Sequence, residues 1–211
     1  MKKSIFLAAL VLISAGCFAQ KANVSKARGL ADAETPDYAG ARAAIAEALQ
    51  NEETKEQANT WYVAGFIGYK EFETANLNRQ IGRNIDFDQW GAAVYESVGY
   101  WDKAYELAMI PTYDKKGRAK YDTRTPKNIL PKLQEYFMYQ PMIIAGFNAY
   151  EANNPSLAYD MFIKHCNIPD AKIFQDNPEE AAKLLRDTSY YTCLYYAGRF
   201  AYEAERYEEA I

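Results

Sequence analysis

The chain has 211 residues, with 24 Lys and Arg against 28 Asp and Glu, and therefore a net charge of −4. Such an acidic chain gives no electrostatic reason to expect a nucleic acid as partner. Aromatic residues make up 15% of the chain, 18 of them Tyr, while Gly and Pro are few and no strand-like alternation stands out. The expected fold class is therefore all-α.

The first 19 residues have the pattern of a secretory signal peptide. Lys2-Lys3 precedes an uncharged, mostly apolar run from Ser4 to Gly16, and Cys17-Phe18-Ala19 ends in a small residue suited to cleavage. The apolar run is shorter than the roughly 20 residues that a membrane-spanning helix needs, so no transmembrane span is expected. The mature protein, residues 20–211, is expected to be exported to the periplasm or cell envelope.

Cys17 leaves lipid attachment as an alternative to simple cleavage after Ala19. A lipid-attachment motif normally has an aliphatic residue where this chain has Ser14, so cleavage is preferred. The other cysteines, Cys166 and Cys193, either form a disulfide, which an exported compartment permits, or are small buried residues. The second interpretation is preferred because both lie in apolar runs with helical spacing.

Three hexapeptides repeat the pattern Ala-Gly-x-x-small-Tyr, at residues 64–69, 145–150 and 197–202. A second small residue follows twelve positions after the glycine in two cases, Ala158 after Gly146 and Ala210 after Gly198, and Gly29 has the same spacing to Ala41. Small residues at this spacing let two antiparallel helices approach closely, while bulky residues such as Phe162 fill the groove between them. The spacing therefore predicts stacked helical hairpins.

These residues resemble the tetratricopeptide repeat. The closest matches are Trp61-x-x-Ala64-Gly65 and Tyr207-Glu208-Glu209-Ala210-Ile211, and the best complete unit runs from about Met142 to Pro169 with Asn153-Asn154-Pro155 as its turn. The resemblance covers about two thirds of the mature chain. It implies an α-solenoid of antiparallel helix pairs wound into a right-handed superhelix.

The array departs from a regular repeat, because the glycine spacings are 36, 81 and 52 instead of the family's period of about 34. Polar insertions are expected near residues 73–89 and 111–127. Between them, residues 90–110 are expected to form one helix, whose Ser97, Trp101 and Ala104 fit the second helix of a repeat. Residues 128–152 are expected to be helical with a kink at Pro141.

At the end of the chain, Tyr207 begins what is expected to be a second helix after a turn at Glu205-Arg206. The last repeat is therefore expected to be incomplete and the chain to be the N-terminal part of a longer array. A repeat without its covering neighbour exposes apolar surface. Residues after about 187 are expected to do so and to fray.

No catalytic, cofactor-binding or metal-binding residues are expected, and the chain is not expected to be an enzyme. The only histidine, His165, has Cys166 as its direct neighbour, and adjacent helical residues point about 100° apart. The mature chain has too few Cys and His residues for a structural zinc site. Paired acids such as Glu179-Glu180 and Glu208-Glu209 are interpreted as residues that open helices, so no pair is a candidate for a hydrolase.

The candidate binding site is a stripe on the first helix of each repeat, next to the small residues and at helical spacing. The resemblance implies that this stripe lines a concave surface that holds a partner; core residues are the alternative interpretation. The family's best-known peptide clamp uses Lys and Asn here, whereas this chain has aromatic and aliphatic side chains and one cation, which favours an apolar or aromatic ligand. The stripe comprises Tyr62, Phe66, Tyr69, Ile143, Phe147, Tyr150, Tyr195, Arg199 and Tyr202.

The expected function is a non-enzymatic protein-interaction scaffold. The alternative is a glycan-binding component of the envelope that stacks sugars on exposed Tyr and Trp residues. Exposure of Trp61, Trp90 and Trp101 would favour it, although the repeat position of Trp61 indicates burial. A basic segment forms a further feature, interpreted as either a solvated loop or a docking site for an anionic partner or a phospholipid surface. Its cations are Lys115, Lys116, Arg118, Lys120, Arg124 and Lys127.

Overall fold

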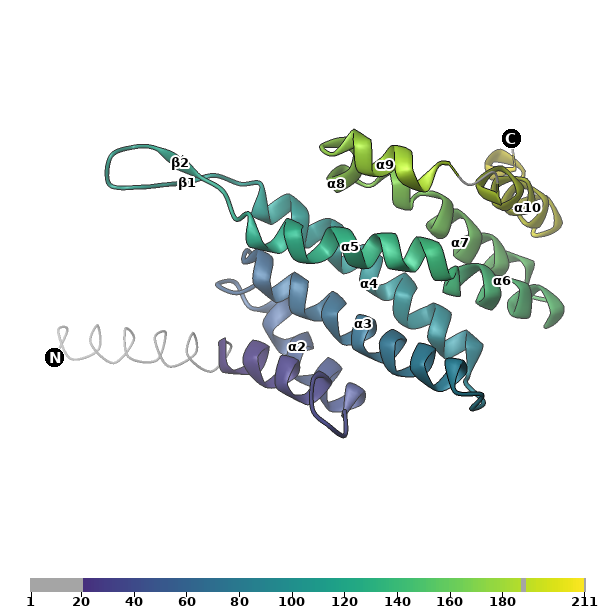
Figure 1. The fold of residues 1–211 in the computed structure, drawn as a ribbon, viewed down its shortest axis with the longest axis horizontal. Coiled ribbons are helices and arrows are strands. Elements are labelled where there is room, and N and C mark those ends of the chain that lie inside the picture. Colours follow the sequence, from purple (N-terminus) through teal and green to yellow (C-terminus); the bar gives the residue numbers. More distant parts are fainter. Residues whose placement is uncertain (1–20, 187–188, 211) are drawn as a thin grey trace, which may run out of the picture.

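The computed structural model describes residues 21–186 and 189–210 (Figure 1). The expected signal peptide and Cys17 lie outside these residues. The described chain is mostly helical, which is consistent with the all-α class, and its strands form one small hairpin. After helical residues 21–31, the elements are α2 (Tyr38–Gln50), α3 (Ala58–Gln80), α4 (Phe87–Ala108), β1 (Thr112–Tyr113), β2 (Ala119–Lys120), α5 (Arg124–Tyr139), α6 (Pro141–Glu151), α7 (Pro155–Cys166), η1 (Ile168–Asp170), α8 (Lys172–Gln175), α9 (Pro178–Leu184), α10 (Ser189–Glu203) and η2 (Tyr207–Glu209).

The two longest helices, α3 and α4, pack side by side through glycines. A Cβ atom on Gly65 would lie closer than 3.0 Å to the ring of Trp101, and one on Gly68 equally close to the carbonyl of Ala93. The close approach lets Ser97 Oγ donate a hydrogen bond to the Gly65 carbonyl at 2.9 Å. Ser97 and Trp101 are therefore packed against a partner helix as expected, and both are buried.

Helices α6 and α7 form the hairpin that the sequence predicts for residues 142–169. Asn153 adopts a left-handed φ of 59°, the Asn154 side chain accepts a hydrogen bond from the Leu157 amide at 3.1 Å, and Pro155 is the first residue of α7. This combination ends one helix and starts the next. A Cβ atom on Gly146 would lie 2.6 Å from the Phe162 ring, so the predicted close approach is present.

The expected polar insertions contain more regular structure than their composition indicates. Residues 73–80 continue α3, residues 81–86 form the loop, and residues 87–89 already belong to α4. Residues 111–127 contain the β1–β2 hairpin and the start of α5. Several residues of this extension have good helix propensity, so α3 continues through it. The extension was not predicted because its polar sequence lacks a clear amphipathic pattern.

Two further expectations need correction. The helix is interrupted before Pro141 and does not merely kink there. Gln140 adopts a left-handed φ of 52° and so separates α5 from α6. Gly29 makes no close helix contact, since nothing lies within 4 Å of its would-be Cβ. Its helix buries Ala27 and Ala31 in place of the glycine.

The buried side chains form two clusters. The first cluster is formed mainly by residues 21–31 together with helices α2, α3, α4, α5 and α8. The second cluster is formed by helices α6, α7 and α10. Cys166 and Cys193 are both buried in the second cluster, in agreement with the preferred interpretation. Helix α10 packs on α7. After it the chain turns at Glu205, which has a φ of 60°. The short 3₁₀ helix η2 follows, where the sequence predicts the start of an α-helix.

Candidate functional site

Helix α5 lies over the part of the predicted stripe that α3 carries. The Tyr69 hydroxyl donates a hydrogen bond to Glu135 Oε2 at 2.8 Å, and the Tyr136 ring lies 5.9 Å from the Tyr69 ring, centroid to centroid. The ammonium group of Lys132 lies 4.6 Å from the centre of the Tyr69 ring. The face that the sequence predicts to be open is thus occupied by a helix of the same chain.

Four stripe residues are therefore core residues, and the expectation that they line an open surface is wrong for them. Tyr62, Phe66 and Tyr69 are only 6–8% exposed, and Ile143 is buried as well. Arg28 adds a cover on the other side, with its guanidinium 5.2 Å from the centre of the Phe66 ring. An apolar stripe at helical spacing is compatible with either outcome, because spacing does not reveal which segment packs on it.

The other five stripe residues remain accessible and come together on α6 and α10. We call them the α6–α10 face; they are Phe147, Tyr150, Tyr195, Arg199 and Tyr202. Tyr195 and Tyr202 are among the most exposed large side chains, at 68% and 66%. Phe147 is 38% exposed and its ring contacts Tyr196 and Phe200 of α10 edge-on. Two segments far apart in sequence thus form one aromatic surface.

Arg199 links the two helices of this face. Its Nη2 donates a hydrogen bond to the Tyr150 hydroxyl of α6 at 3.1 Å, and its Nε donates to Glu203 at 2.8 Å. The hydrogen bond from Arg199 lowers the pKa of Glu203, while the same contact raises the pKa of Arg199. Both groups are therefore charged at neutral pH, which suits recognition better than proton transfer.

Two exposed tyrosines border this face and were not predicted. Tyr191 lies one helical turn before Tyr195 on α10 and is 66% exposed. Tyr207 of η2 is 56% exposed, and its ring centre lies 5.5 Å from that of Tyr202. Extending the i, i+4 spacing one turn backward would have identified Tyr191. Aromatic surface is thus exposed after residue 187, as expected, while fraying of this segment stays a prediction.

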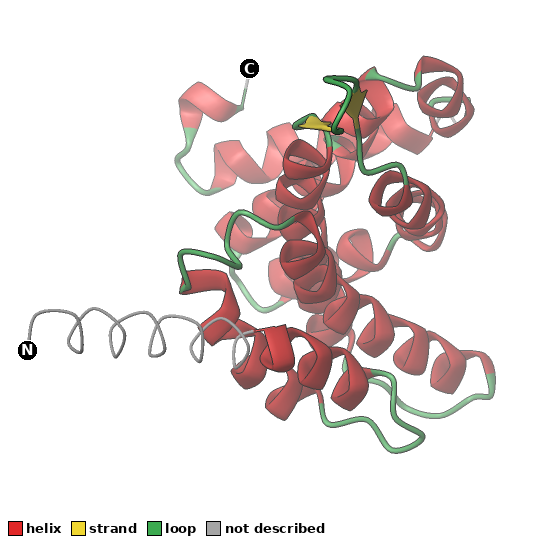
Figure 2. Cartoon of the chain, turned by 90° about the vertical axis from the view of Figure 1, so that its left-hand side faces the viewer, coloured by secondary structure: helices red, strands yellow, loops and turns green. Residues whose placement is uncertain are grey.

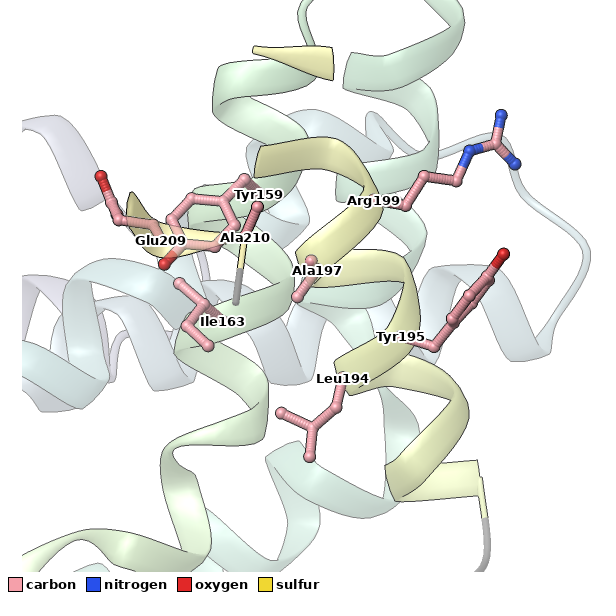
Figure 3. A pocket seen from close by; sticks show the side chains of 9 residues that line it. Tyr159, Ile163, Leu194, Tyr195, Ala197, Arg199, Glu209 and Ala210 are labelled. Carbon is pink, nitrogen blue, oxygen red and sulfur yellow. The ribbon is translucent and has the colours of Figure 1, made fainter. Parts of the chain in front are cut away.

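A cavity of about 600 Å³ lies beside α10, on the side that faces α7 and η2. Figure 3 shows Leu194 and Ala197 pointing toward Ile163 of α7, whereas Tyr195 and Arg199 point to the opposite side of α10. Glu209, which lines the cavity, forms an ion pair with Arg206 at 2.6 Å, and Arg206 also pairs with Asp160 at 2.7 Å. Tyr195 and Arg199 are nevertheless among the residues that line the cavity, so the cavity adjoins the α6–α10 face.

The tryptophans required by the glycan-binding alternative are not exposed. Trp90 and Trp101 are each 1% exposed. Trp61 is partly buried; its Nε1 donates to the Lys55 carbonyl at 2.6 Å and its ring packs against Tyr100. Each indole belongs to the packing of the helices, so stacking of sugars on them has no support.

His165 is a core residue. It is 1% exposed, its ring stacks on Phe137 with centroids 4.6 Å apart, and burial lowers its pKa to about 4. Burial likewise raises the pKa of the adjacent Cys166 thiol to about 12. Among residues 21–186 and 189–210, no group of His, Cys, Asp and Glu side chains is arranged to hold a metal ion. No helix in the same residues is both long and apolar enough to cross a membrane.

Comparison with known proteins adds no assignment. No protein-family model matches the chain, and neither a curated protein nor a solved structure is similar to it.

Proposed function

We propose that this chain is a non-enzymatic, exported protein-interaction scaffold, built as a helix-pair array of the tetratricopeptide kind, that binds a partner protein on the α6–α10 face. The predicted signal peptide supports export. The α6–α7 hairpin, with its close glycine contact and the stacking of α10 on α7, supports the array. The proposed partner is a protein segment with apolar or aromatic side chains.

The observation that carries the proposal is the composition and order of this face. Exposed tyrosines on one side of α10 surround an arginine that is held in place by Tyr150 and Glu203. Tyr and Arg are the residue types most enriched among side chains that dominate binding energy. Because Arg199 is already held by two neighbours, less rotamer entropy is lost when a partner binds.

The position of α5 restricts the proposed partner-binding site to the end of the molecule that contains α6 and α10. The groove that a tetratricopeptide array would use between α3 and its neighbours is filled by Tyr136, whose ring lies 4.9 Å from Phe72 and 5.6 Å from Trp101. Opening it would expose these rings to water. Binding at α6 and α10 therefore requires less free energy of rearrangement, because the aromatic side chains there are already exposed.

The test is affinity capture from a cell-envelope extract with three forms of the protein. These are the unchanged protein, a Tyr195→Ala, Arg199→Ala, Tyr202→Ala variant, and a control variant Tyr113→Ala, Tyr121→Ala that removes two exposed tyrosines from the hairpin. Circular dichroism verifies that all three are folded. The captured protein is then purified and its affinity measured by titration.

We expect the unchanged protein and the control variant to bind the same purified partner, and the triple variant to bind at least about tenfold more weakly. Equal affinity of all three forms would reject the α6–α10 face. Recovery of polysaccharide alone would reject the protein-scaffold function and favour glycan binding.

A further inference from the structure

The β1–β2 hairpin is an ordered projection at the end of the molecule opposite to α10. In Figure 1 it extends beyond the helices, and in Figure 2 it lies on the side that faces the viewer while α10 recedes. Thr112 pairs with Lys120 and Tyr113 with Ala119. At the tip, Asp114 Oδ1 accepts hydrogen bonds from the amides of Lys116 at 2.8 Å and Arg118 at 3.0 Å. The tip has a defined conformation.

The hairpin and the first turn of α5 carry a positive charge within an acidic chain. Residues 112–127 contain six basic side chains and two carboxylates, a net charge of +4, whereas the whole chain carries −4. Both carboxylates have internal partners: Asp114 pairs with Arg118 at 2.8 Å, and Asp122 accepts from the Thr125 hydroxyl at 2.6 Å. Within the described residues, Lys115, Lys116 and Lys120 form no ion pair. These lysines are available for an external anion.

Amphipathic side chains accompany the lysines. Tyr113 is 70% exposed, Tyr121 is 53% exposed, and Ile110 at the base is 59% exposed. Side chains alternate between the two faces of a strand. Because Tyr113 is paired with Ala119, these two residues share one face of the hairpin and Lys120 lies on the other, while Tyr121 directly follows β2. The hairpin therefore carries exposed aromatic rings together with cations at its tip and on β2.

We propose that this hairpin is a peripheral contact with an anionic phospholipid surface. Lysines next to an anionic leaflet gain favourable electrostatic energy, and tyrosines prefer the boundary between headgroups and acyl chains, so this combination suits a membrane surface. The shape adds a second reason. A narrow projection encloses no ligand, but its tip reaches a flat surface without a clash with the helices behind it (Figure 1).

This contact is separate from the proposed partner site. The aromatic side chains of the α6–α10 face lie on α6 and α10, while the cations here lie between Lys115 and Lys127, before and in the first turn of α5. A chain held to a membrane surface by the hairpin would leave α10 at the end of the molecule that is far from the lipid (Figure 1). Either proposal stands or fails without the other.

The test is co-sedimentation of the protein with vesicles of phosphatidylcholine alone or of phosphatidylcholine and phosphatidylglycerol in equal parts. We expect binding only to the anionic vesicles, and loss of binding in high salt, because the Debye length falls from about 10 Å at 0.1 M to about 3 Å at 1 M. Each lysine changes the partition coefficient about fivefold, so a Lys115→Ala, Lys116→Ala variant should bind roughly 25-fold more weakly. A Lys21→Ala, Lys26→Ala variant removes two exposed lysines elsewhere and should bind like the unchanged protein.

A second measurement locates the contact. In a Tyr113→Trp variant, the difference in emission from the unchanged protein reports the environment of the hairpin, and we expect a blue shift with anionic vesicles only. Absence of binding to anionic vesicles, or equal losses in the two lysine variants, would overturn the proposal. Equal binding to soluble polyglutamate without a blue shift would also overturn it, and would make the hairpin a contact for acidic polypeptides.

Discussion

The Tyr69 hydroxyl and the Glu135 carboxylate, 2.8 Å apart, link α3 to α5. Burial, assisted by the nearby carboxylate of Glu135, raises the pKa of Tyr69 well above its usual value. The hydroxyl therefore remains a proton donor throughout the physiological range. Tyr69 thus belongs to the packing between two helices of this chain, although its position in the repeat would suit a partner-binding residue.

Replacing Tyr69 by Phe keeps the ring in place and removes this hydrogen bond. Because Glu135 is only partly buried and can be hydrated, we expect the free energy of unfolding to fall by about 0.5–1.5 kcal/mol. Urea denaturation measures it. Tyr121→Phe is the matched control, because its hydroxyl lies on an exposed part of the hairpin, and no change is expected. A Tyr69→Phe protein as stable as the control would show that the bond contributes nothing.

Glycine substitutions should separate true helix contacts from an accidental match in spacing. A Gly68→Ala Cβ would lie closer than 3.0 Å to the Ala93 backbone, so we expect a loss of about 1–3 kcal/mol or more. Gly29 has open space around it within a helix, so Gly29→Ala should stabilise the protein by about 0.5–1 kcal/mol. Thermal unfolding followed by circular dichroism compares both with the unchanged protein. Destabilisation by Gly29→Ala would restore the contact that the spacing predicts.

The fold was predictable where local signals and packing agree. In the α6–α7 hairpin, Asn154 caps a helix, Pro155 starts it, and Gly146 admits the ring of Phe162. The cap and the proline act within a few residues of chain, so sequence alone identifies them. The contact of Gly146 with Phe162, and the packing of Ser97 and Trp101 on α3, reach further along the chain, and the repeat pattern indicated them.

The candidate site was predictable only in part, because the cover of a helix face depends on distant segments. Tyr69 and Tyr202 occupy equivalent positions of the repeat, yet Tyr69 is 8% exposed under α5 and Tyr202 is 66% exposed. The polar segment before α5 gave no indication that the chain returns over α3. The match at Gly29 failed for a related reason: a twelve-residue spacing includes a turn whose length is not fixed.

Replacement of Arg42 should lower the free energy of unfolding more than replacement of a cation in an exposed ion pair. It pairs with Glu71 at 2.6 Å and Glu96 at 3.0 Å, and so joins α2 to α3 and α4, while the Glu71 side chain is only 9% exposed. Arg42→Leu leaves that carboxylate buried with Gln89 as its remaining partner, so we expect a loss of about 1–3 kcal/mol. Urea denaturation measures the change.

Two further variants test the reason for this loss. Adding Glu71→Gln to Arg42→Leu removes the buried charge and should recover part of the stability. Lys103→Ala breaks an exposed pair with Glu106, which water screens, and should leave stability nearly unchanged. If the double variant is no more stable than Arg42→Leu, desolvation of Glu71 is not the cause.

His165 should make the protein less stable in acid. Burial lowers its pKa to about 4 in the folded state, whereas an unfolded histidine has its ordinary pKa of about 6.5. Between these values the unfolded chain binds a proton that the folded chain does not. The contribution of His165 to stability is therefore fully present above the unfolded pKa and is lost as the pH falls toward the folded pKa, by at most about 1.4 kcal/mol per pH unit. Urea denaturation across this window should give a flatter pH dependence for His165→Gln than for the unchanged protein, since the other titrating groups contribute equally to both. Parallel curves for the two proteins would mean that His165 takes up its proton as readily in the folded chain as in the unfolded one.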